Sequence, residues 1–135
     1  MDIFVVNLDK STLRLAEMSK RLAQLDLPFT RVSAVYGASL TDDELNRHYN
    51  SALNQRVYRR PLAAAEIGCY LSHRNIWQTI VDDNLSMALI LEDDAELGAQ
   101  LPAALATVEN LTRPWDVIKL YEPQIKKPLA RSIPL

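Results

Sequence analysis

Three consecutive carboxylates, Glu92-Asp93-Asp94, are the residues of this chain best placed to do chemistry. In an extended backbone successive side chains point to opposite sides, so Glu92 and Asp94 would share one side and Asp93 would face the other. Two carboxylates at this spacing form a hard oxygen donor pair that suits Mg²⁺ or Mn²⁺, with water and a diphosphate as further ligands. The triplet therefore predicts a metal site that could hold a nucleotide diphosphate.

A second interpretation gives the triplet no chemistry. Asp93 or Asp94 would cap a following helix, while Glu92 and Glu96 would be solvated. Taken alone, the triplet favours this second interpretation, because acidic turns between a strand and a helix are common.

The segment before the triplet predicts a strand buried on both faces. Residues 87–91 are apolar on both faces, with Asn84 before them and the acids after them. Such runs are typical of a parallel α/β sheet covered by helices. In open α/β sheets the ligand crevice lies outside the carboxyl ends of the strands, so the acids would face it.

The rest of the chain alternates predicted strands and helices. Strands are predicted over residues 3–8, 29–35 and 115–121, and helices over 12–25, 62–81 and 97–111. A further short helix begins at a capping box, with Thr41 as cap and Glu44 three positions on. Strand 3–8, helix 12–25 and strand 29–35 form the opening of a βαβ unit.

Other segments give less regular predictions. Residues 50–60 have no apolar period and are predicted to be a mobile surface loop, and 122–135 to be a proline-rich extended tail. Pro61 is predicted to open the long helix. Gly68, inside that helix, predicts close approach by another backbone or by a ligand, since glycine there costs about 1 kcal/mol relative to alanine.

Composition limits the class of protein. The 135 residues are 48% hydrophobic and 24% charged, which predicts one domain with a real core. With 15 basic and 17 acidic residues, nothing predicts binding to nucleic acid. Cys69 is the single cysteine, which excludes an intramolecular disulfide and a cysteine zinc cluster and favours a reducing compartment. The start Met1-Asp2 lacks the cations of a signal peptide, so a cytoplasmic protein is expected, with peripheral contact to the inner face of the cell membrane left open.

Four groups of residues, in this order and spacing, resemble glycosyltransferase family 25, the lipopolysaccharide-type galactosyltransferases. The resemblance covers roughly residues 3 to 121. The groups are Val6-Asn7-Leu8-Asp9 with Arg14, Arg31-Val32 with Ala34-Val35-Tyr36-Gly37, Glu66-Ile67-Gly68-Cys69-Tyr70-Leu71-Ser72-His73 with Trp77, and Ala88-Leu89-Ile90-Leu91-Glu92-Asp93-Asp94.

The resemblance implies a fold and an activity. The fold is a GT-A-like, nucleotide-binding α/β domain with a mostly parallel sheet flanked by helices, here a partial domain over residues 1–121 that is truncated at its C-terminus. The activity is inverting transfer of a hexose, commonly galactose, from a UDP-sugar to an oligosaccharide or lipopolysaccharide acceptor.

The resemblance also implies site residues. Glu92 and Asp94 match the family's Asp-x-Asp-like element, which makes them the expected ligands of Mn²⁺ or Mg²⁺, with Asp93 beside the nucleotide-sugar. The resemblance thereby reverses the preference for helix capping. Asn7, Asp9 and Arg14 match the first-strand motif beside the nucleotide. Asp9 could bond a uracil or ribose edge and Arg14 the phosphates; equally, Asp9 could be a turn residue and Arg14 an exposed helix cation.

The helix motif has two interpretations as well. Glu66, Ser72 and His73 match the family, but His73 shares a helix face with Cys69 and Trp77, so a core histidine bonded to a backbone carbonyl is at least as good an interpretation as a substrate contact. No residue is identified as the general base that an inverting transfer needs.

Three arginines precede this helix, and they also have two interpretations. They could meet an anionic acceptor or a diphosphate, or could simply be solvated. They are Arg56, Arg59 and Arg60.

Two departures from the family keep alternatives open. Tyr36 stands where the family usually has an acid, and the chain is shorter than family members. A second hypothesis is therefore a catalytically incomplete relic that binds a nucleotide-sugar or a partner without turnover. A nucleotidyltransferase is less favoured, because no glycine-rich phosphate loop follows the first strand. An open sheet edge near residues 117–120 would favour a homo-oligomer.

Overall fold

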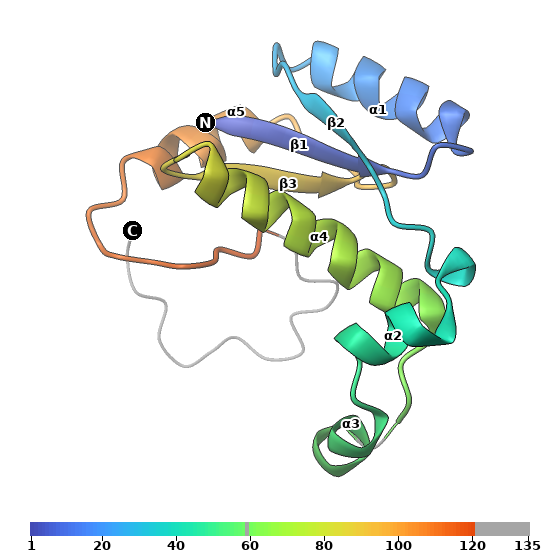
Figure 1. Cartoon of the computed structure of the whole chain (residues 1–135). Helices are drawn as coiled ribbons and strands as arrows, with labels where there is room; N and C mark the ends of the chain where they lie inside the picture. Colours follow the sequence, from blue (N-terminus) through green and yellow to red (C-terminus); the bar gives the residue numbers. More distant parts are fainter. Residues whose placement is uncertain (59, 121–135) are drawn as a thin grey trace.

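The chain folds around a parallel sheet of three strands in the order β2-β1-β3. The computed structural model describes residues 1–58 and 60–120. Figure 1 shows α1 on one side of the sheet and α4 on the other, with α2 beside the N-terminal end of α4. In chain order the elements are β1 (Asp2–Asn7), α1 (Thr12–Ala23), β2 (Thr30–Ser33), the 3₁₀ turn η1 (Gly37–Ser39), α2 (Asp42–His48), α3 (Ser51–Val57), α4 (Ala64–Asp82), β3 (Ala88–Glu92) and α5 (Leu101–Glu109). The predicted α/β class with a parallel sheet is confirmed.

The central strand β1 is buried on both faces because its alternate side chains meet different helices. Val5 packs with Met18 and Leu22 of α1, and all three are fully buried. Phe4 and Val6 point the other way and pack against Ile76 of α4. Fully burying one such aliphatic or aromatic side chain contributes about 1.5–3 kcal/mol. Helices on both faces explain why β1 and β3 are apolar without alternation.

The strand register brings polar residues to one edge of the sheet. Asn7, the last residue of β1, lies opposite Ser33 of β2, and Val6 lies opposite Glu92 of β3. All three strands are parallel, so their carboxyl ends meet at this edge. At the opposite edge the amino group of Met1 forms a 2.8 Å ion pair with Glu109 of α5.

The local signals for helix starts are confirmed in part. At α2 the hydroxyl of Thr41 accepts from the backbone N–H of Glu44, and the Glu44 carboxylate accepts from the backbone N–H of Thr41 at 2.8 Å, which is the predicted capping box. Ser11 precedes α1 but makes no side-chain cap. The long helix begins at Ala64, three residues after Pro61.

Two predicted segments are wrong. Residues 51–57 form α3, capped by Asn50, whose side chain accepts from the backbone N–H of Leu53 at 2.9 Å. This helix buries none of its residues, so it has no apolar period for sequence analysis to detect. Residues 115–120 form no strand: Val117 is 80% exposed, and an apolar β-branched run does not become a strand without a sheet edge and a core to meet. The argument for a homo-oligomer from an open edge there loses its basis.

Other boundaries shift or fall outside the described residues. Helix α5 covers 101–109 of the predicted 97–111, with Pro102 in its first turn, where proline is tolerated. The predicted tail, 122–135, lies outside the described residues, as does Arg59. Among the described helices, none combines the length and the apolar character needed to cross a membrane.

Arg60, predicted to be in a mobile loop, instead anchors the start of α4. Its guanidinium donates to both carboxylate oxygens of Glu66, at 3.0 and 2.6 Å. Glu66 also accepts from the backbone N–H of Ala63 at 2.8 Å. The Arg60 contact first, and the Ala63 contact second, lower the pKa of Glu66 to about 2.

We expect Arg60→Gln to raise the pKa of Glu66 back toward its ordinary value of 4.5. A lowered folded-state pKa contributes stability above pH 4.5 that is lost as the pH falls toward 2, so the variant should lose less stability over that range. A carbon NMR titration of the Glu66 carboxyl group measures the shift. The carboxyl of Glu44, held by Thr41, is the internal control and should not move; an unchanged Glu66 midpoint would contradict the assignment.

Gly68 allows the helix α4 to touch the backbone that follows β2. A Cβ atom at Gly68 would lie 2.6 Å from the carbonyl oxygen of Val35 and 2.7 Å from the nitrogen of Gly37. The predicted close approach by another backbone is confirmed. Gly37 is equally confined, because its own Cβ would lie 1.8 Å from the carbonyl oxygen of Ala64.

Gly68→Ala should therefore destabilise the fold despite the better helix propensity of alanine. The clash is with backbone atoms, and overpacking of this kind typically costs about 1–3 kcal/mol. Gly98→Ala is the matched control, since a Cβ there meets nothing within 4 Å and its effect should stay within about 0.5 kcal/mol. Urea unfolding of both variants makes the comparison. Equal urea midpoints for the two variants would show that the backbone at Val35 and Gly37 can move to accommodate a methyl group at position 68 without cost.

Candidate functional site

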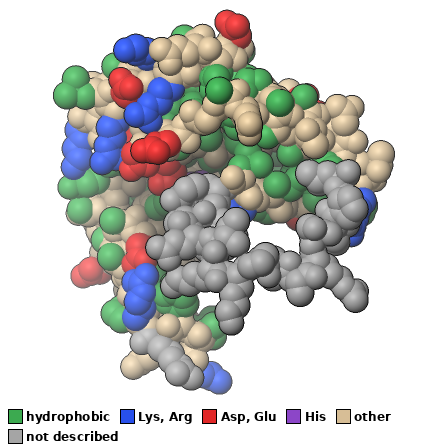
Figure 2. All heavy atoms as spheres, turned by 180° about the vertical axis from the view of Figure 1, so that it is seen from behind, with side chains coloured by type: hydrophobic (Ala, Val, Ile, Leu, Met, Phe, Trp, Pro, Cys, Tyr) green, Lys and Arg blue, Asp and Glu red, His purple; other side chains and the backbone are tan. Residues whose placement is uncertain are grey.

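A cleft lined by both apolar and charged side chains lies at the carboxyl ends of β1 and β3. In the sheet order β2-β1-β3, the chain passes from β1 to β2 on one side and then returns through α4 to β3 on the other side of β1. Ligand crevices of α/β sheets form where the strand order reverses in this way. The cleft has a volume of about 370 Å³. Seen from behind, this end of the molecule carries acidic and basic side chains side by side (Figure 2). The lining residues are Val6, Leu8, Arg14, Ala34, Val35, Tyr36, Gly37, Ala38, Ala65, Cys69, Ser72, Glu92, Asp93 and Asp94.

Asn7 is the buried centre of the polar network beside this cleft. Its side chain is almost fully buried, and its amide nitrogen donates to Asp93 Oδ2 at 2.6 Å and to the carbonyl of Ser11 at 3.0 Å. Its amide oxygen accepts from Nε of Arg31 at 3.0 Å. One side chain thus joins the ends of β1 and β3, the start of α1 and strand β2.

Arg14 joins helix α1 to the acid triplet. Its guanidinium donates to Asp93 at 3.1 Å and lies 3.4 Å from a carboxylate oxygen of Asp94. The hydrogen bond to Asp93 raises the pKa of Arg14, and the charges of Asp93 and Asp94 raise it further. Asp94 is 63% exposed, whereas Asp93 is only 9% exposed. Asp93 is therefore committed to structure, and Asp94 is open to a ligand.

Asp9 forms a second ion pair at the rim of the same edge. It accepts from Arg31 and from the hydroxyl of Ser33, the latter at 2.9 Å. These two contacts, with Arg31 first, lower the pKa of Asp9. Asp9 itself is exposed and lies at the end of β1, but the cleft lining does not include it.

The acid triplet departs from the extended geometry on which its spacing argument depends. Strand β3 ends at Glu92, and Asp93 and Asp94 form a turn that the backbone N–H of Ala95 closes on the carbonyl of Glu92 at 3.1 Å. Arg21 of α1 donates to the Ala95 carbonyl at 2.8 Å and fixes this turn. Asp93 and Asp94 cap no helix, because α5 begins only at Leu101, so the capping interpretation is wrong.

The Glu92 carboxylate contacts two residues of α4. One of its carboxylate oxygens lies 3.6 Å from Sγ of Cys69 and 3.5 Å from Nε2 of His73. Burial raises the pKa of the Cys69 thiol, and the Glu92 carboxylate raises it further. The imidazole of His73 also meets Trp77 edge to face, with ring centroids 6.4 Å apart. Glu92, like Asp94, lines the cleft.

The α4 side of the cleft is held by the other motif residues. The hydroxyl of Ser72 accepts from the backbone N–H of Val35 at 2.8 Å and donates to the carbonyl of Gly68 at 2.7 Å, so Ser72 positions the backbone. Tyr36 is half exposed at the cleft, with Nζ of Lys10 3.7 Å from its ring centroid. An aromatic ring at this position could stack on a planar ligand.

The structure brings together most of the residues singled out from sequence. Five lie at the carboxyl ends of β1 and β3: four are joined by hydrogen bonds or ion pairs, Glu92 lines the cleft beside them, and Asp9 lies at the rim. Sequence analysis missed Arg31 and Cys69 as members of this region. Arg31 is a cation inside a short edge strand, and it could be recognised as a site residue only once the register of β2 against β1 is known. The five are Asn7, Arg14, Glu92, Asp93 and Asp94.

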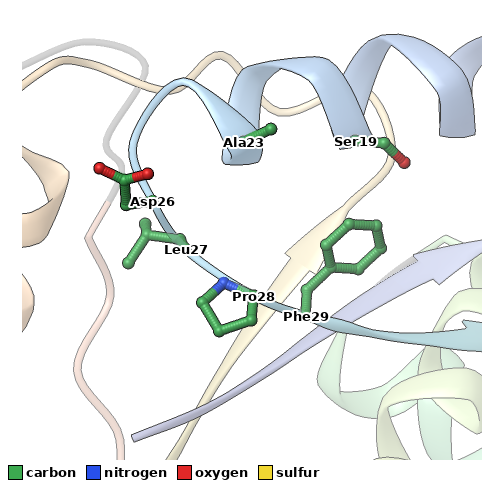
Figure 3. A pocket seen from close by; sticks show the side chains of 6 residues that line it. All are labelled: Ser19, Ala23, Asp26, Leu27, Pro28 and Phe29. Atoms are coloured by element: carbon green, nitrogen blue, oxygen red, sulfur yellow. The ribbon is translucent and has the colours of Figure 1, made fainter.

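A second hollow lies at the far end of α1 and lacks these features. Figure 3 shows its lining side chains, which come from the last turns of α1 and the loop into β2. Asp26 is the one charged residue among them, so no convergent set of polar groups defines a ligand there. The six are Ser19, Ala23, Asp26, Leu27, Pro28 and Phe29.

Fold and cleft together define a parallel α/β domain with an acidic and basic ligand crevice at its strand ends. The family model described as Glycosyltransferase family 25 (LPS biosynthesis protein) matches residues 1–129. The chain belongs to glycosyltransferase family 25, which confirms the resemblance seen in its motifs.

Curated relatives carry names from the same family. The chain is 32% identical to Procollagen galactosyltransferase 1-B of Xenopus laevis over 126 residues, 88% of this chain and 21% of that protein. It is 30% identical to Procollagen galactosyltransferase 2 of Homo sapiens, over 98% of this chain and 22% of that protein. A Glycosyltransferase 25 family member of Anopheles gambiae is 35% identical over 95 residues, 68% of this chain and 16% of that protein. The chain thus spans about a fifth of the length of the relatives it matches most fully.

Asn7→Ala tests whether the buried amide organises the cleft. The substitution leaves the Asp93 carboxylate and the Arg31 guanidinium without one partner each, and an unsatisfied buried polar group costs about 1–3 kcal/mol. We expect a loss of that size in the free energy of unfolding, measured with urea. Asn75→Ala, at an exposed position of α4, is the control and should change it by less than about 0.5 kcal/mol. Equal effects of the two substitutions would remove Asn7 from this role.

Proposed function

We propose that the cleft binds the diphosphate and sugar of a UDP-hexose, with galactose as the sugar, as the donor site of a glycosyl transfer. The observation that carries this proposal is the convergence of Arg14, Glu92 and Asp94 on a cleft at the β1–β3 reversal. Membership of glycosyltransferase family 25 and the galactosyltransferase names of the relatives support it. The sequence motifs add Asn7, Asp9 and Asp93 to this donor site; of these, Asn7 and Asp93 would act by positioning Arg14.

The side chains divide into those that hold the site and those that meet the donor. Asn7 and Arg31 fix Asp93, and Asp93 in turn fixes the guanidinium of Arg14. Arg14 is 58% exposed, so the remaining N–H groups of its guanidinium are accessible to a phosphate oxygen. Asp9, paired with Arg31 at the rim, would accept a hydrogen bond from a ribose or uracil edge in this proposal.

A divalent metal is part of this proposal. Glu92 and Asp94 are both exposed carboxylates at the cleft, a donor set that suits Mn²⁺ or Mg²⁺, and they would hold the ion together with the diphosphate. Such an ion, when bound, would offset the negative charge that grows on the departing diphosphate.

The transfer we propose is inverting. The acceptor hydroxyl would attack the anomeric carbon from the face opposite the diphosphate, and its proton would pass to a general base. For the acceptor we keep a lipopolysaccharide sugar, the class that the family description names; the names of the relatives give procollagen as the acceptor to test beside it. Binding of the donor without turnover is the competing function. A cytoplasmic location and contact with the inner face of the membrane stay predictions.

Calorimetric titration of UDP-galactose into the purified chain, with and without Mn²⁺, tests the donor site. We expect binding that requires the metal and weakens at least about tenfold in Asp94→Asn, because the variant loses one charged metal ligand. Asp116→Asn is the control, since Asp116 is an exposed acid outside the cleft. Equal binding by Asp94→Asn and the parent chain would remove Asp94 from the site.

Turnover is a separate measurement. Release of UDP in the presence of a lipopolysaccharide oligosaccharide or of a collagen peptide distinguishes transfer from donor binding alone. Metal-dependent binding without release with either acceptor would favour the non-catalytic alternative.

A further inference from the structure

Cys69, His73 and Glu92 bring three different metal-binding atoms together beside the donor cleft. Cys69 and His73 are four residues apart on α4 and therefore lie on one face of that helix, and Glu92 ends β3 opposite them. The thiol sulfur, the imidazole nitrogen and a carboxylate oxygen all lie within 4.8 Å of one another. Among the described residues this is the one group of at least three such side chains that could share an ion.

The spacing of these atoms is close to what a tetrahedral ion requires. Zinc bonds of about 2.0–2.3 Å imply ligand atoms roughly 3.3–3.7 Å apart in a tetrahedron. The carboxylate oxygen of Glu92 lies 3.5 Å from His73 Nε2 and 3.6 Å from Cys69 Sγ. The ligand atoms of Cys69 and His73 lie within 4.8 Å of each other.

An unpartnered atom points to a ligand at this place. Nε2 of His73 is shielded from solvent and has no hydrogen-bond partner within residues 1–58 and 60–120. Its 3.5 Å approach to Glu92 brings opposite charges together only when the imidazole is protonated, and it is not aligned as a hydrogen bond. Buried polar nitrogens are nearly always satisfied, and a neutral imidazole nitrogen facing a thiol and a carboxylate is a ready metal donor.

The donor chemistry selects the metal. A thiolate and an imidazole favour Zn²⁺ over Mg²⁺ and Mn²⁺, which prefer oxygen ligands. We propose that Cys69, His73 and Glu92 bind one Zn²⁺ ion, with a fourth coordination position open at the cleft that Cys69 and Glu92 line. This site is distinct from the carboxylate pair of Glu92 and Asp94, but the two sites share Glu92. Zinc at Cys69 and His73 would thus withdraw Glu92 from an ion held with Asp94.

Zinc binding to the purified 135-residue chain tests the proposal, in a reductant that contains no thiol. Calorimetry with Zn²⁺ alone should give one site per chain, weakened at least about tenfold in Cys69→Ser and in His73→Gln. Co²⁺ as a spectroscopic probe should give a near-ultraviolet thiolate-to-cobalt charge-transfer band, which Zn²⁺ abolishes by displacement. The Co²⁺ band is read on the unaltered chain, so it does not depend on the folding of any variant.

Two control variants separate this site from the alternatives. His48→Gln removes the other histidine, an exposed residue of α2, and should leave zinc affinity unchanged. Asp94→Asn should also leave zinc affinity unchanged while it weakens the metal-dependent binding of UDP-galactose, so the two sites can fail independently. A folded chain that binds no Zn²⁺, a Co²⁺ complex without the thiolate band, or unchanged affinity in Cys69→Ser would each overturn the proposal.

Discussion

The buried amide of Asn7 is the constraint on which the cleft depends. It donates to Asp93 and to the Ser11 carbonyl and accepts from Arg31, so each of its hydrogen-bonding directions fixes a different element. Hydrogen bonds to charged groups contribute about 1.5–3 kcal/mol each, more than neutral ones, and burial raises the cost of leaving any one unmade. The geometry of Asp93 and Arg14 at the cleft follows from this one side chain.

The sheet order explains why such a network forms at this edge. The middle strand β1 ends between two neighbours to which the chain connects on opposite faces, through α1 and through α4. Neither connection covers the carboxyl ends of the strands. Close contact of α4 with the backbone at Val35 and Gly37, which only glycine at position 68 permits, then forms the opposite wall of the cleft. The helices therefore bury the faces of the sheet, while the charged side chains lie at the exposed carboxyl ends of the strands.

Sequence reasoning succeeded where a local pattern of residues determines the structure. It failed where the structure depends on contacts with residues that are distant in the sequence. The runs that became β1 and β3 and the capping box at Thr41 were predicted because each depends on neighbouring residues. The close approach at Gly68 was predicted because a glycine inside a helix is itself a signal, although the sequence did not identify its distant partners, Val35 and Gly37. The strand expected at 115–121 is absent through residue 120, because hydrophobicity alone does not provide a partner strand. Arg31 and Cys69 were missed as members of the site for a related reason: their roles exist only through contacts with residues distant in the sequence.

Glu92 could serve as a ligand in either of two proposed metal sites, one with Asp94 and one with Cys69 and His73. The strand turns immediately after it, so its carboxylate lies near a thiol and an imidazole on α4, while Asp94 is beside the guanidinium of Arg14. An ion that prefers oxygen gains most from Asp94 and a diphosphate, and one that accepts sulfur and nitrogen gains most from Cys69 and His73. If the donor diphosphate binds beside Arg14 as we propose, its oxygen ligands would lie on the Asp94 side and would draw Glu92 toward that side. The metal ion that the Glu92 carboxylate binds would then link binding of the sugar donor to the identity of the metal present.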